Sequence, residues 1–477
     1  MKAIKILLFT AVMTLSATGA MAQTDNKAVI DQISKVIKSG QDKKAIESEV
    51  KNVLKSHKKD VDVITAIGRA YLEAGDVEKA MSYAQQAMTR DKNYGEAYVL
   101  AGDVESAKDD GGAASAWYEQ ASTNDPKNPV GYVRYAIANS KISPKTSIER
   151  LELLRQNVPS FPVDLTAADI YQRAGNIKEA LKYFDKADKN VMERGQLADY
   201  AMDLFLLNDF EKSLQVSTFG NQKFPRYAAL NRLSLYNSTN LKQYDKALLY
   251  ADRRFNQSDS AQIKSRDYLY YGYAFLGNDR YEEAIDMYNK SLETAEDDAN
   301  RADALKNIAT AYQKMGNMNA AADAYDKYLK TQAQPTAYDL GTLASMWQDY
   351  AKNLEGDEKA AALNKADAIW GQIADNFPTA ATLATYNRAH IAFELDPEST
   401  EGLARPHYET LIAQLANKAD RDSRETNYLV EAYRYLGYYY LLKNDKDNSI
   451  DNWSKLLEIA PDNAQAKTAL EALQKKK

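Results

Sequence analysis

A regular interval between small residues restricts the fold of this chain more than any other feature. Small residues at Gly68 and Ala80 lie twelve positions apart, and Gly75-Asp76 between them combines a helix stop with a helix start. Small side chains let two helices approach closely, so this interval predicts a helical hairpin. The same interval separates Gly102 and Ala114, Ala136 and Ile148, Ala168 and Ala180, Ala201 and Ser213, Leu235 and Ala247, Ala309 and Ala321, and Gly437 and Ser449.

The hairpins recur with a fixed period. The first small residues of successive pairs, Gly68, Gly102 and Ala136, lie 34 positions apart. A helix-turn-helix unit with this period indicates a stack of repeats. In the second predicted helices an aromatic residue follows the small residue by four positions, and we expect it to fill the gap left by the small residue of the next unit. These aromatics are Tyr118, Phe184, Tyr288, Tyr325, Trp370, Tyr408 and Trp453.

With these marks the chain resembles the tetratricopeptide repeat family. The last unit, LGYYYLLKNDKDNSIDNWSKLLEIAPDN from Leu436, is nearly the family pattern, and the resemblance extends from about Val61 to Asn463. It implies an all-α fold, an α-solenoid in which about eleven or twelve helical hairpins form a right-handed superhelix. No linker rich in proline, glycine or serine interrupts the pattern, which favours one array over separate globular domains.

We expect five segments along this array. They are a signal peptide (1–22), an N-terminal helical pair or cap (23–60), the regular array (61–335), irregular units with longer helices (336–425), and the C-terminal repeat with a capping helix (426–477).

The first segment has the order of a secretory signal peptide. Lys2 and Lys5 precede an apolar run from Ile6 to about Leu15, and Ala20-Met21-Ala22 predicts cleavage before Gln23. An uncleaved anchor is the alternative, but the run is shorter than a membrane span requires. No later segment is long and apolar enough to span. We therefore expect an exported protein, in the periplasm or secreted.

Composition excludes several classes of function. The chain has no cysteine, which excludes disulfides, thiolate metal sites, a cysteine nucleophile and the lipidated cysteine of a lipoprotein. Its net charge of −6 gives no basic footprint for nucleic acid.

The sequence contains no recognisable catalytic motif. The histidines His57, His390 and His407 fall in separate units, and no phosphate-binding glycine loop or nucleophile elbow is present. The segment Asp109–Gly112 lacks the ligand spacing of a calcium loop and is interpreted as a hairpin turn. We expect no catalytic residue, no cofactor and no metal. An enzyme whose site lies in residues 336–424 and uses His390 or His407 is the alternative.

Tyrosine is the one excess in composition, with 33 tyrosines against 11 phenylalanines. Tyr268 and Tyr271 fall three apart on one helix stripe, as do Tyr435 and Tyr438, and in the family this stripe faces the inner groove where ligands bind. Arginine and tyrosine often anchor interfaces. By position, the resemblance places in the groove Arg69, Asp103, Arg134, Asp169, Arg173, Phe205, Arg232, Tyr236, Tyr268, Tyr271, Lys306, Arg434, Tyr435 and Tyr438. An ordinary amphipathic surface is the alternative.

These expectations together favour a non-catalytic scaffold of the bacterial cell envelope, which binds partner proteins through the concave groove. Some family members grip a partner's terminal carboxylate with lysine and asparagine one turn apart, but here Thr310 follows Lys306, so that function does not carry over. A glycan- or nutrient-binding component of an outer-membrane uptake system is the alternative. The loop Asp259-Ser260-Ala261 looks like a short glycosylation acceptor, which is a separate hypothesis.

Overall fold

The computed structural model describes residues 20–40 and 42–474, and these residues fold almost entirely into α-helices. The chain divides into two units, one ending at Asn208 and one beginning at Asp209. The expected signal peptide lies outside the described residues except for its last three positions, and Lys475–Lys477 lie outside them as well. Within the described part, no helix has both the length and the apolar character needed to cross a membrane.

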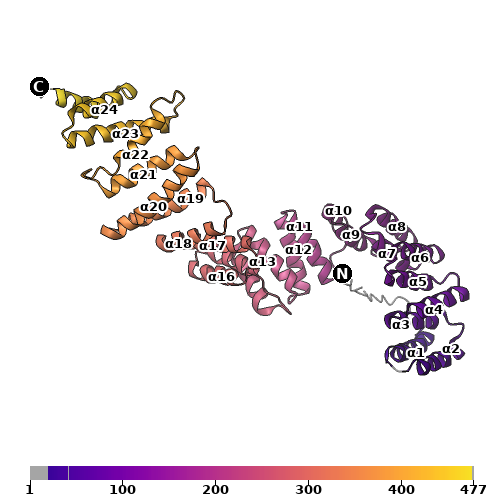
Figure 1. Ribbon diagram of the computed structural model, residues 1–477. Helices are drawn as coiled ribbons and strands as arrows, with labels where there is room; N and C mark the ends of the chain where they lie inside the picture. Colours follow the sequence, from indigo (N-terminus) through magenta and orange to yellow (C-terminus); the bar gives the residue numbers. More distant parts are fainter. Residues whose placement is uncertain (1–19, 41, 475–477) are drawn as a thin grey trace. The chain divides into compact units, whose positions relative to one another are not determined.

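The first unit contains eleven α-helices among its described residues, which follow one another in chain order (Figure 1). They are α1 (Ala20–Lys38), α2 (Lys43–His57), α3 (Val61–Glu73), α4 (Val77–Arg90), α5 (Gly95–Ala107), α6 (Gly111–Asn124), α7 (Pro129–Asn139), α8 (Pro144–Asn157), α9 (Val163–Arg173), α10 (Ile177–Phe184) and α11 (Arg194–Leu206).

The second unit contains the remaining α-helices and one π-helical turn, η1. They are α12 (Phe210–Lys223), α13 (Ala228–Asn240), α14 (Tyr244–Asp252), η1 (Arg253–Gln257), α15 (Ser265–Gly277), α16 (Tyr281–Glu293), α17 (Asp298–Lys314), α18 (Met318–Thr331), α19 (Ala337–Ala351), α20 (Gly356–Asn376), α21 (Ala381–Leu395), α22 (Arg405–Leu415), α23 (Ser423–Leu442), α24 (Lys446–Ile459) and α25 (Ala464–Gln474).

Each odd-numbered helix from α3 to α9 and from α13 to α23 packs against the next even-numbered helix, so the two form a hairpin. We name the odd-numbered member the first helix and the even-numbered member the second helix. Some first helices also contact the first helix of the neighbouring hairpin: α3 contacts α5, and α13 contacts α15. The predicted all-α stack of helical hairpins is confirmed.

The hairpin turns use the expected stop and start signals. Gly75 has φ +83°, in the left-handed region that ends a helix, and the side chain of Asp76 accepts the backbone N–H of Lys79 to cap α4. In the next hairpin Asp109 has φ +61°, and Asp110 caps α6. The acidic stretch from Asp109 is therefore a turn, as the sequence indicated.

Small residues make room for large ones, but the partner differs from the prediction. A Cβ atom on Gly102 would lie 2.4 Å from the Tyr118 ring, and one on Gly272 would lie 2.4 Å from the Tyr288 ring. Each aromatic therefore fills the gap left by the small residue of its own hairpin, and the expected filling of the next unit's gap is wrong at these positions. The reason is the tight contact between the two helices of one hairpin.

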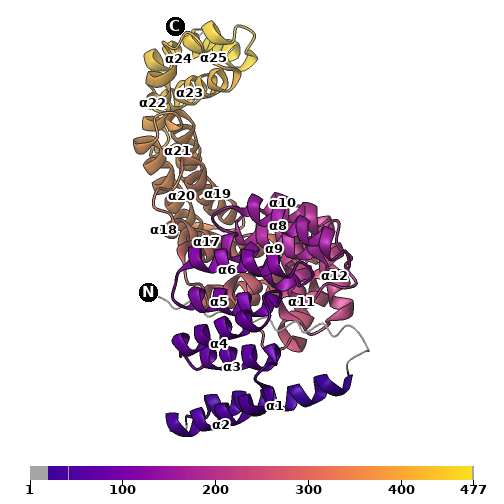
Figure 2. The same ribbon diagram turned by 90° about the vertical axis from the view of Figure 1, so that its right-hand side faces the viewer.

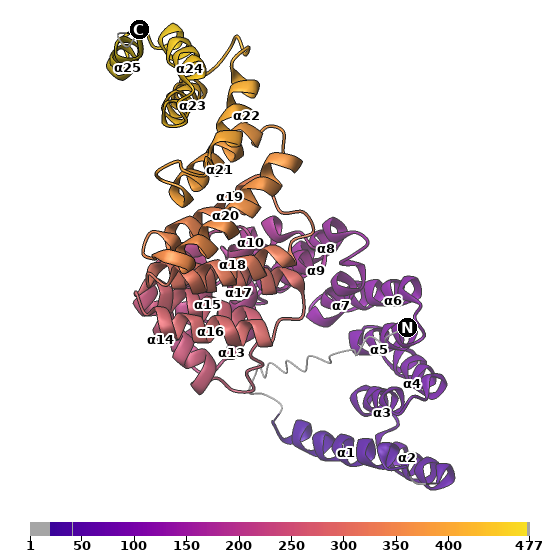
Figure 3. The same ribbon diagram turned by 60° about the vertical axis from the view of Figure 1, so that its left-hand side comes forward.

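The two ends of the array are also helical. Helices α1 and α2 lie beside α3 (Figure 2), and α25 packs on α24 at the other end (Figure 3). The longest helix of the described residues, α20, has 21 residues. The loop before α22 folds around Asp396, whose carboxylate accepts the backbone N–H groups of Thr400, Glu401, Gly402 and Leu403.

Candidate partner-binding surface

The first helices of the first unit carry arginines that are already paired with acids. Arg69 on α3 lies 3.1 Å from Asp103 on α5 and 2.6 Å from Glu96. Arg134 on α7 approaches the same Asp103 carboxylate at 3.5 Å, and Tyr118 donates a hydrogen bond to it. We name Arg69, Glu96, Asp103 and Arg134 the first-unit row. Its positive charges are neutralised within the protein.

Further along the first unit, α9 and α11 bring acids together. Arg173 pairs with Asp169 at 2.9 Å on the surface of α9. Gln172 donates a hydrogen bond to Asp203 on α11, whose side chain is buried. Burial and, after it, the nearby Asp199 charge raise the pKa of Asp203 to about 6. This surface is acidic rather than basic.

The first helices of the second unit present aromatic rings with a different electrostatic character. Tyr236 on α13 stacks on Tyr270 on α15 with ring centroids 4.0 Å apart, and Tyr270 meets Tyr273 edge to face. The guanidinium of Arg266 lies 5.8 Å and 5.7 Å from the Tyr236 and Tyr270 ring centroids, within the range of a cation–π contact. On α17, the exposed Lys306 lies against the Tyr328 ring.

We name Arg232, Tyr236, Arg266, Tyr270, Tyr273 and Lys306 the second-unit row. Tyr236 and Tyr270 are 6% and 8% exposed, whereas Arg266 is exposed. The rings therefore form a buried support, and the guanidinium forms the outer surface.

A buried ionic network lies beneath this row. Asp267 is fully buried and binds Arg232 at 2.9 Å and Arg254 at 2.9 Å, while Tyr236 donates its hydroxyl to the same carboxylate at 2.9 Å. Burial disfavours the charged form of Asp267, but the two guanidinium groups outweigh it and hold the pKa of that carboxyl below its ordinary value. The backbone N–H of Lys264 adds a further hydrogen bond.

Two arginines share this one carboxylate. Arg254 comes from the π-helical turn η1 and is only 1% exposed. Its Nη2 also donates to the Gln262 carbonyl, and its Nη1 has no hydrogen-bond partner in the described part of the chain. The network therefore carries an excess of positive charge.

The structure separates two of the predicted groove residues from this row. Tyr268 and Tyr271 pack on Phe255 of η1, with ring centroids 5.1 Å away in both cases, and Tyr271 also stacks on Phe275. They lie on the side of α15 that faces the preceding hairpin. Tyr270, Tyr273 and Arg266, which do lie in the row, were not among the predicted residues.

Phe205, another predicted groove residue, lies on α11 of the first unit, and three more lie on α23, the first helix of the C-terminal hairpin. Arg434 is exposed, Tyr438 is 47% exposed, and Tyr435 is 7% exposed because it packs against Tyr408 and Phe393. They lie on a helix surface but in a different part of the second unit from the second-unit row. The structure does not bring the two sets together.

A second polar cluster lies next to these residues. Glu431 on α23 is 2.7 Å from His390 and accepts hydrogen bonds from Tyr408 and Tyr386 at 2.8 Å and 3.1 Å. Burial works against its charge, but the bonds from His390, Tyr408 and Tyr386 outweigh burial and lower the pKa of the Glu431 carboxyl. The cluster links α21, α22 and α23.

The other histidines do not converge with these groups. Burial, and then the positive charge of Arg388, lower the pKa of His407. Among the described residues, no group of three or more His, Cys, Asp or Glu side chains is arranged to hold a metal ion.

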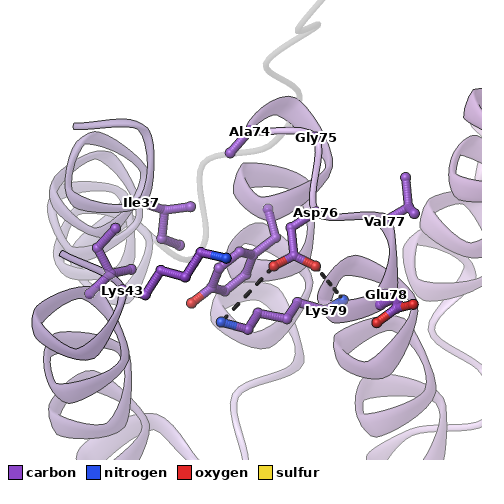
Figure 4. A pocket seen from close by; sticks show the side chains of 10 residues that line it. Ile37, Lys43, Ala74, Gly75, Asp76, Val77, Glu78 and Lys79 are labelled. Carbon is purple, nitrogen blue, oxygen red and sulfur yellow. Dashed lines mark hydrogen bonds and ion pairs between the residues drawn. The ribbon is translucent and has the colours of Figure 1, made fainter. Parts of the chain in front are cut away.

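A surface pocket of about 480 Å³ lies at the turn between α3 and α4 (Figure 4). Its lining includes Ile37, Lys43 and Tyr71, and two of its charged groups have partners within the protein. Asp76 caps α4, and Lys79 pairs with Glu47 at 2.7 Å. We interpret it as a gap between packed helices.

Comparison with known proteins identifies the repeats. Tetratricopeptide repeat models match residues 61–94 and 267–334. The photosystem I assembly protein Ycf3 of Prochlorococcus marinus is 30% identical over 125 residues, which cover 25% of this chain and 71% of that protein.

Two solved structures are also similar. The C-terminal part of a tetratricopeptide repeat protein from Cytophaga hutchinsonii has 23% identity and a TM-score of 0.42, covering 57% of this chain and 99% of that one. A tetratricopeptide repeat protein from Parabacteroides merdae has 14% identity and a TM-score of 0.32, covering 51% and 97%. On the repeat models and the Ycf3 relative, the chain belongs to the tetratricopeptide repeat family.

Proposed function

We propose that this protein is a non-catalytic scaffold of the bacterial cell envelope, which holds a partner protein on the exposed side of its first helices. Its repeats support the role of a protein–protein interaction scaffold. The second-unit row is the surface that we assign to the partner.

One observation carries this assignment. In the second-unit row, the exposed Arg266 and Lys306 form no ion pair with another described residue, and stacked tyrosines support Arg266 from below. Arginine on an aromatic support is pre-organised, so a partner would bind it at a lower entropic cost. The arginines of the first-unit row are neutralised by acids and are therefore less available to bind a partner.

The partner surface is tested by crosslinking and capture from native cells. The variant Arg266→Ala/Tyr273→Ala/Lys306→Ala changes three side chains of the row that reach the surface. The matched control, Arg280→Ala/Tyr281→Ala/Lys290→Ala, removes the same residue types from the second helix of the same hairpin, α16, and its N-cap. We expect the first variant to lose a partner that wild type and the control retain. Equal capture by all three would refute the assignment.

Location in the envelope is a separate proposal, which rests on the leader-like residues 1–22. We expect osmotic fractionation to release the native protein from the periplasm with Gln23 as its first residue. A cytoplasmic protein that retains Met1 would contradict this location and leave the partner surface untouched.

A further inference from the structure

We propose that the second-unit row recognises an acidic stretch of the partner through its side-chain carboxylates, with Arg266 as the principal contact. This inference rests on the proposed function and adds the chemical class of the partner segment. It follows from three features of the row: an unpaired cation, occupied ring faces, and excess positive charge beneath.

An unpaired cation on a tyrosine support distinguishes this row from the other first helices. Arg434 on α23 is also exposed and forms no ion pair with a described residue, but it has no cation–π contact among them. Arg69, Arg134 and Arg173 each lie within 4.0 Å of a carboxylate, as does Arg232. Arg266 is exposed, and no carboxylate of the described residues pairs with it. A guanidinium presents several N–H donors in a fixed plane, which suits the two oxygens of a carboxylate. The missing acid is therefore the group that a partner would supply.

The ring faces beneath Arg266 are already occupied. Tyr236 and Tyr270 stack on each other, and the Arg266 guanidinium covers both. Nucleobases bind such rows by stacking on free aromatic faces. Because these faces are not free, an acidic protein segment fits better than a nucleic acid.

Excess positive charge extends below and beside the contact. Arg232 and Arg254 share the single carboxylate of Asp267. Lys306 on α17 adds an exposed ammonium, and Asp303 is the nearby acid on the same helix. Four cations thus face two carboxylates in this region, counting Arg232, Arg254, Arg266 and Lys306 against Asp267 and Asp303. The local charge is positive on an acidic protein, which directs an acidic segment to this surface.

The test measures binding of a fluorescent peptide of alternating glutamate and alanine to the full chain, by anisotropy. The peptide is acetylated and amidated, so it has no terminal carboxylate. A second peptide carries glutamine in place of glutamate. We expect the full chain to bind the glutamate peptide and not the glutamine peptide, with affinity that falls as salt screens the charges.

The variant Arg266→Gln removes the principal contact, and its control is Arg280→Gln. Arg280 also lies over an aromatic ring, that of Phe275, but it has its own acid in Glu283. Both variants change the net charge equally. We expect Arg266→Gln to weaken binding about tenfold or more, as for a hydrogen bond to a charged group. Lys306→Gln should weaken it at most about fivefold, as for an exposed ion pair.

Several results would overturn the inference. Equal weakening by Arg266→Gln and Arg280→Gln would show that only net charge matters. Binding of the glutamine peptide, or tighter binding of a single-stranded oligonucleotide than of the glutamate peptide, would also do so. If the native partner is still lost from the Arg266→Ala/Tyr273→Ala/Lys306→Ala protein while neither peptide binds, the proposed function stands and the acidic character of the segment is wrong.

Discussion

Replacing Asp267 by asparagine tests the network that supports the second-unit row. Asp267 is fully buried and is the carboxylate shared by Arg254 and Arg232. Asparagine keeps the shape but removes the charge. Arg232 is 30% exposed and can turn toward water, whereas Arg254 is 1% exposed and cannot. A buried cation left without its partner destabilises a protein by about 3–5 kcal/mol, and we expect a free energy of unfolding lower by this amount.

The variant Arg254→Met provides the comparison. It removes the buried cation, while Asp267 keeps both contacts to Arg232, at 2.9 Å and 3.2 Å, and the hydroxyl of Tyr236. We expect a cost of only about 1–3 kcal/mol, because no charge is left unpaired. The double variant Arg254→Met/Asp267→Asn should recover part of the loss caused by Asp267→Asn alone.

The assay combines urea unfolding, followed by circular dichroism, with amide hydrogen exchange. Hydrogen exchange is needed because the hairpins of a stacked array do not all unfold together. We expect faster exchange in α15 of Asp267→Asn than in wild type. A loss below about 1 kcal/mol, or a loss no larger than that of Arg254→Met, would refute the reasoning.

The pH dependence gives an independent check. The folded pKa of Asp267 is lower than its unfolded value, so its contribution to stability is complete above the unfolded pKa. It is lost as pH falls below about 4 toward the folded pKa. We expect Asp267→Asn to lack this part of the acid-induced loss of stability.

Three further changes test other parts of the molecule. The pKa of Asp203 is raised to about 6, so the folded protein loses stability as the pH rises from about 4 to 6 and this carboxyl becomes charged. The variant Asp203→Asn should therefore raise the free energy of unfolding at pH 7 by up to about 3 kcal/mol. It should also reduce the decrease in the free energy of unfolding between about pH 4 and 6. Glu431→Gln should lower the free energy of unfolding at pH 7 by about 2 kcal/mol, with faster hydrogen exchange in α21 and α23. Part of the stability that wild type loses when the pH falls below about 4.5 should be absent in this variant. Gly272→Ala should lower the melting temperature, at a cost of about 1–3 kcal/mol, because its Cβ would displace the buried Tyr288 ring. The control, Gly195→Ala, has no atom within 4 Å of the new Cβ and should not lower it.

The sequence predicts the hairpins because their signals are local and repeated. Gly102 and Ala114 fall on α5 and α6, and Asp109-Asp110 between them forms the turn. A helical hairpin requires small residues where its two helices approach closely and a stop signal between them, and both can be recognised from the residue types. Repetition then removes the ambiguity that a single unit would leave.

The predicted tyrosine surface depended on the choice of helix stripe. Tyr435 and Tyr438 lie two positions before and one position after Gly437. The equivalent positions around Gly272 are occupied by Tyr270 and Tyr273, which is where the structure places the row. Tyr268 and Tyr271 share the spacing of three but not this offset from the small residue. Counting from the glycine would have selected the tyrosines of the row.

The buried network beneath the row could not be predicted in this way. Arg254 and Asp267 lie thirteen positions apart and are brought together through the π-helical turn η1 and the loop that follows it. Their separation does not correspond to the repeat period, and a lone arginine near the end of a helix is usually exposed. Only the folded chain shows that this arginine is buried.

The repeat itself explains why the two rows differ. In the first unit, Arg69 finds its acid one repeat later, since Asp103 lies 34 positions along the chain on the next first helix. In the second unit Arg232 pairs in the same manner with Asp267, 35 positions along, but there the acid is buried and shared with Arg254. The next arginine, Arg266, forms no ion pair with Asp303 or with any other acid of α17 among the described residues, and its guanidinium lies against tyrosine rings instead. The series of pairs between neighbouring first helices therefore ends at Arg266, which is why a carboxylate from another protein would complete it.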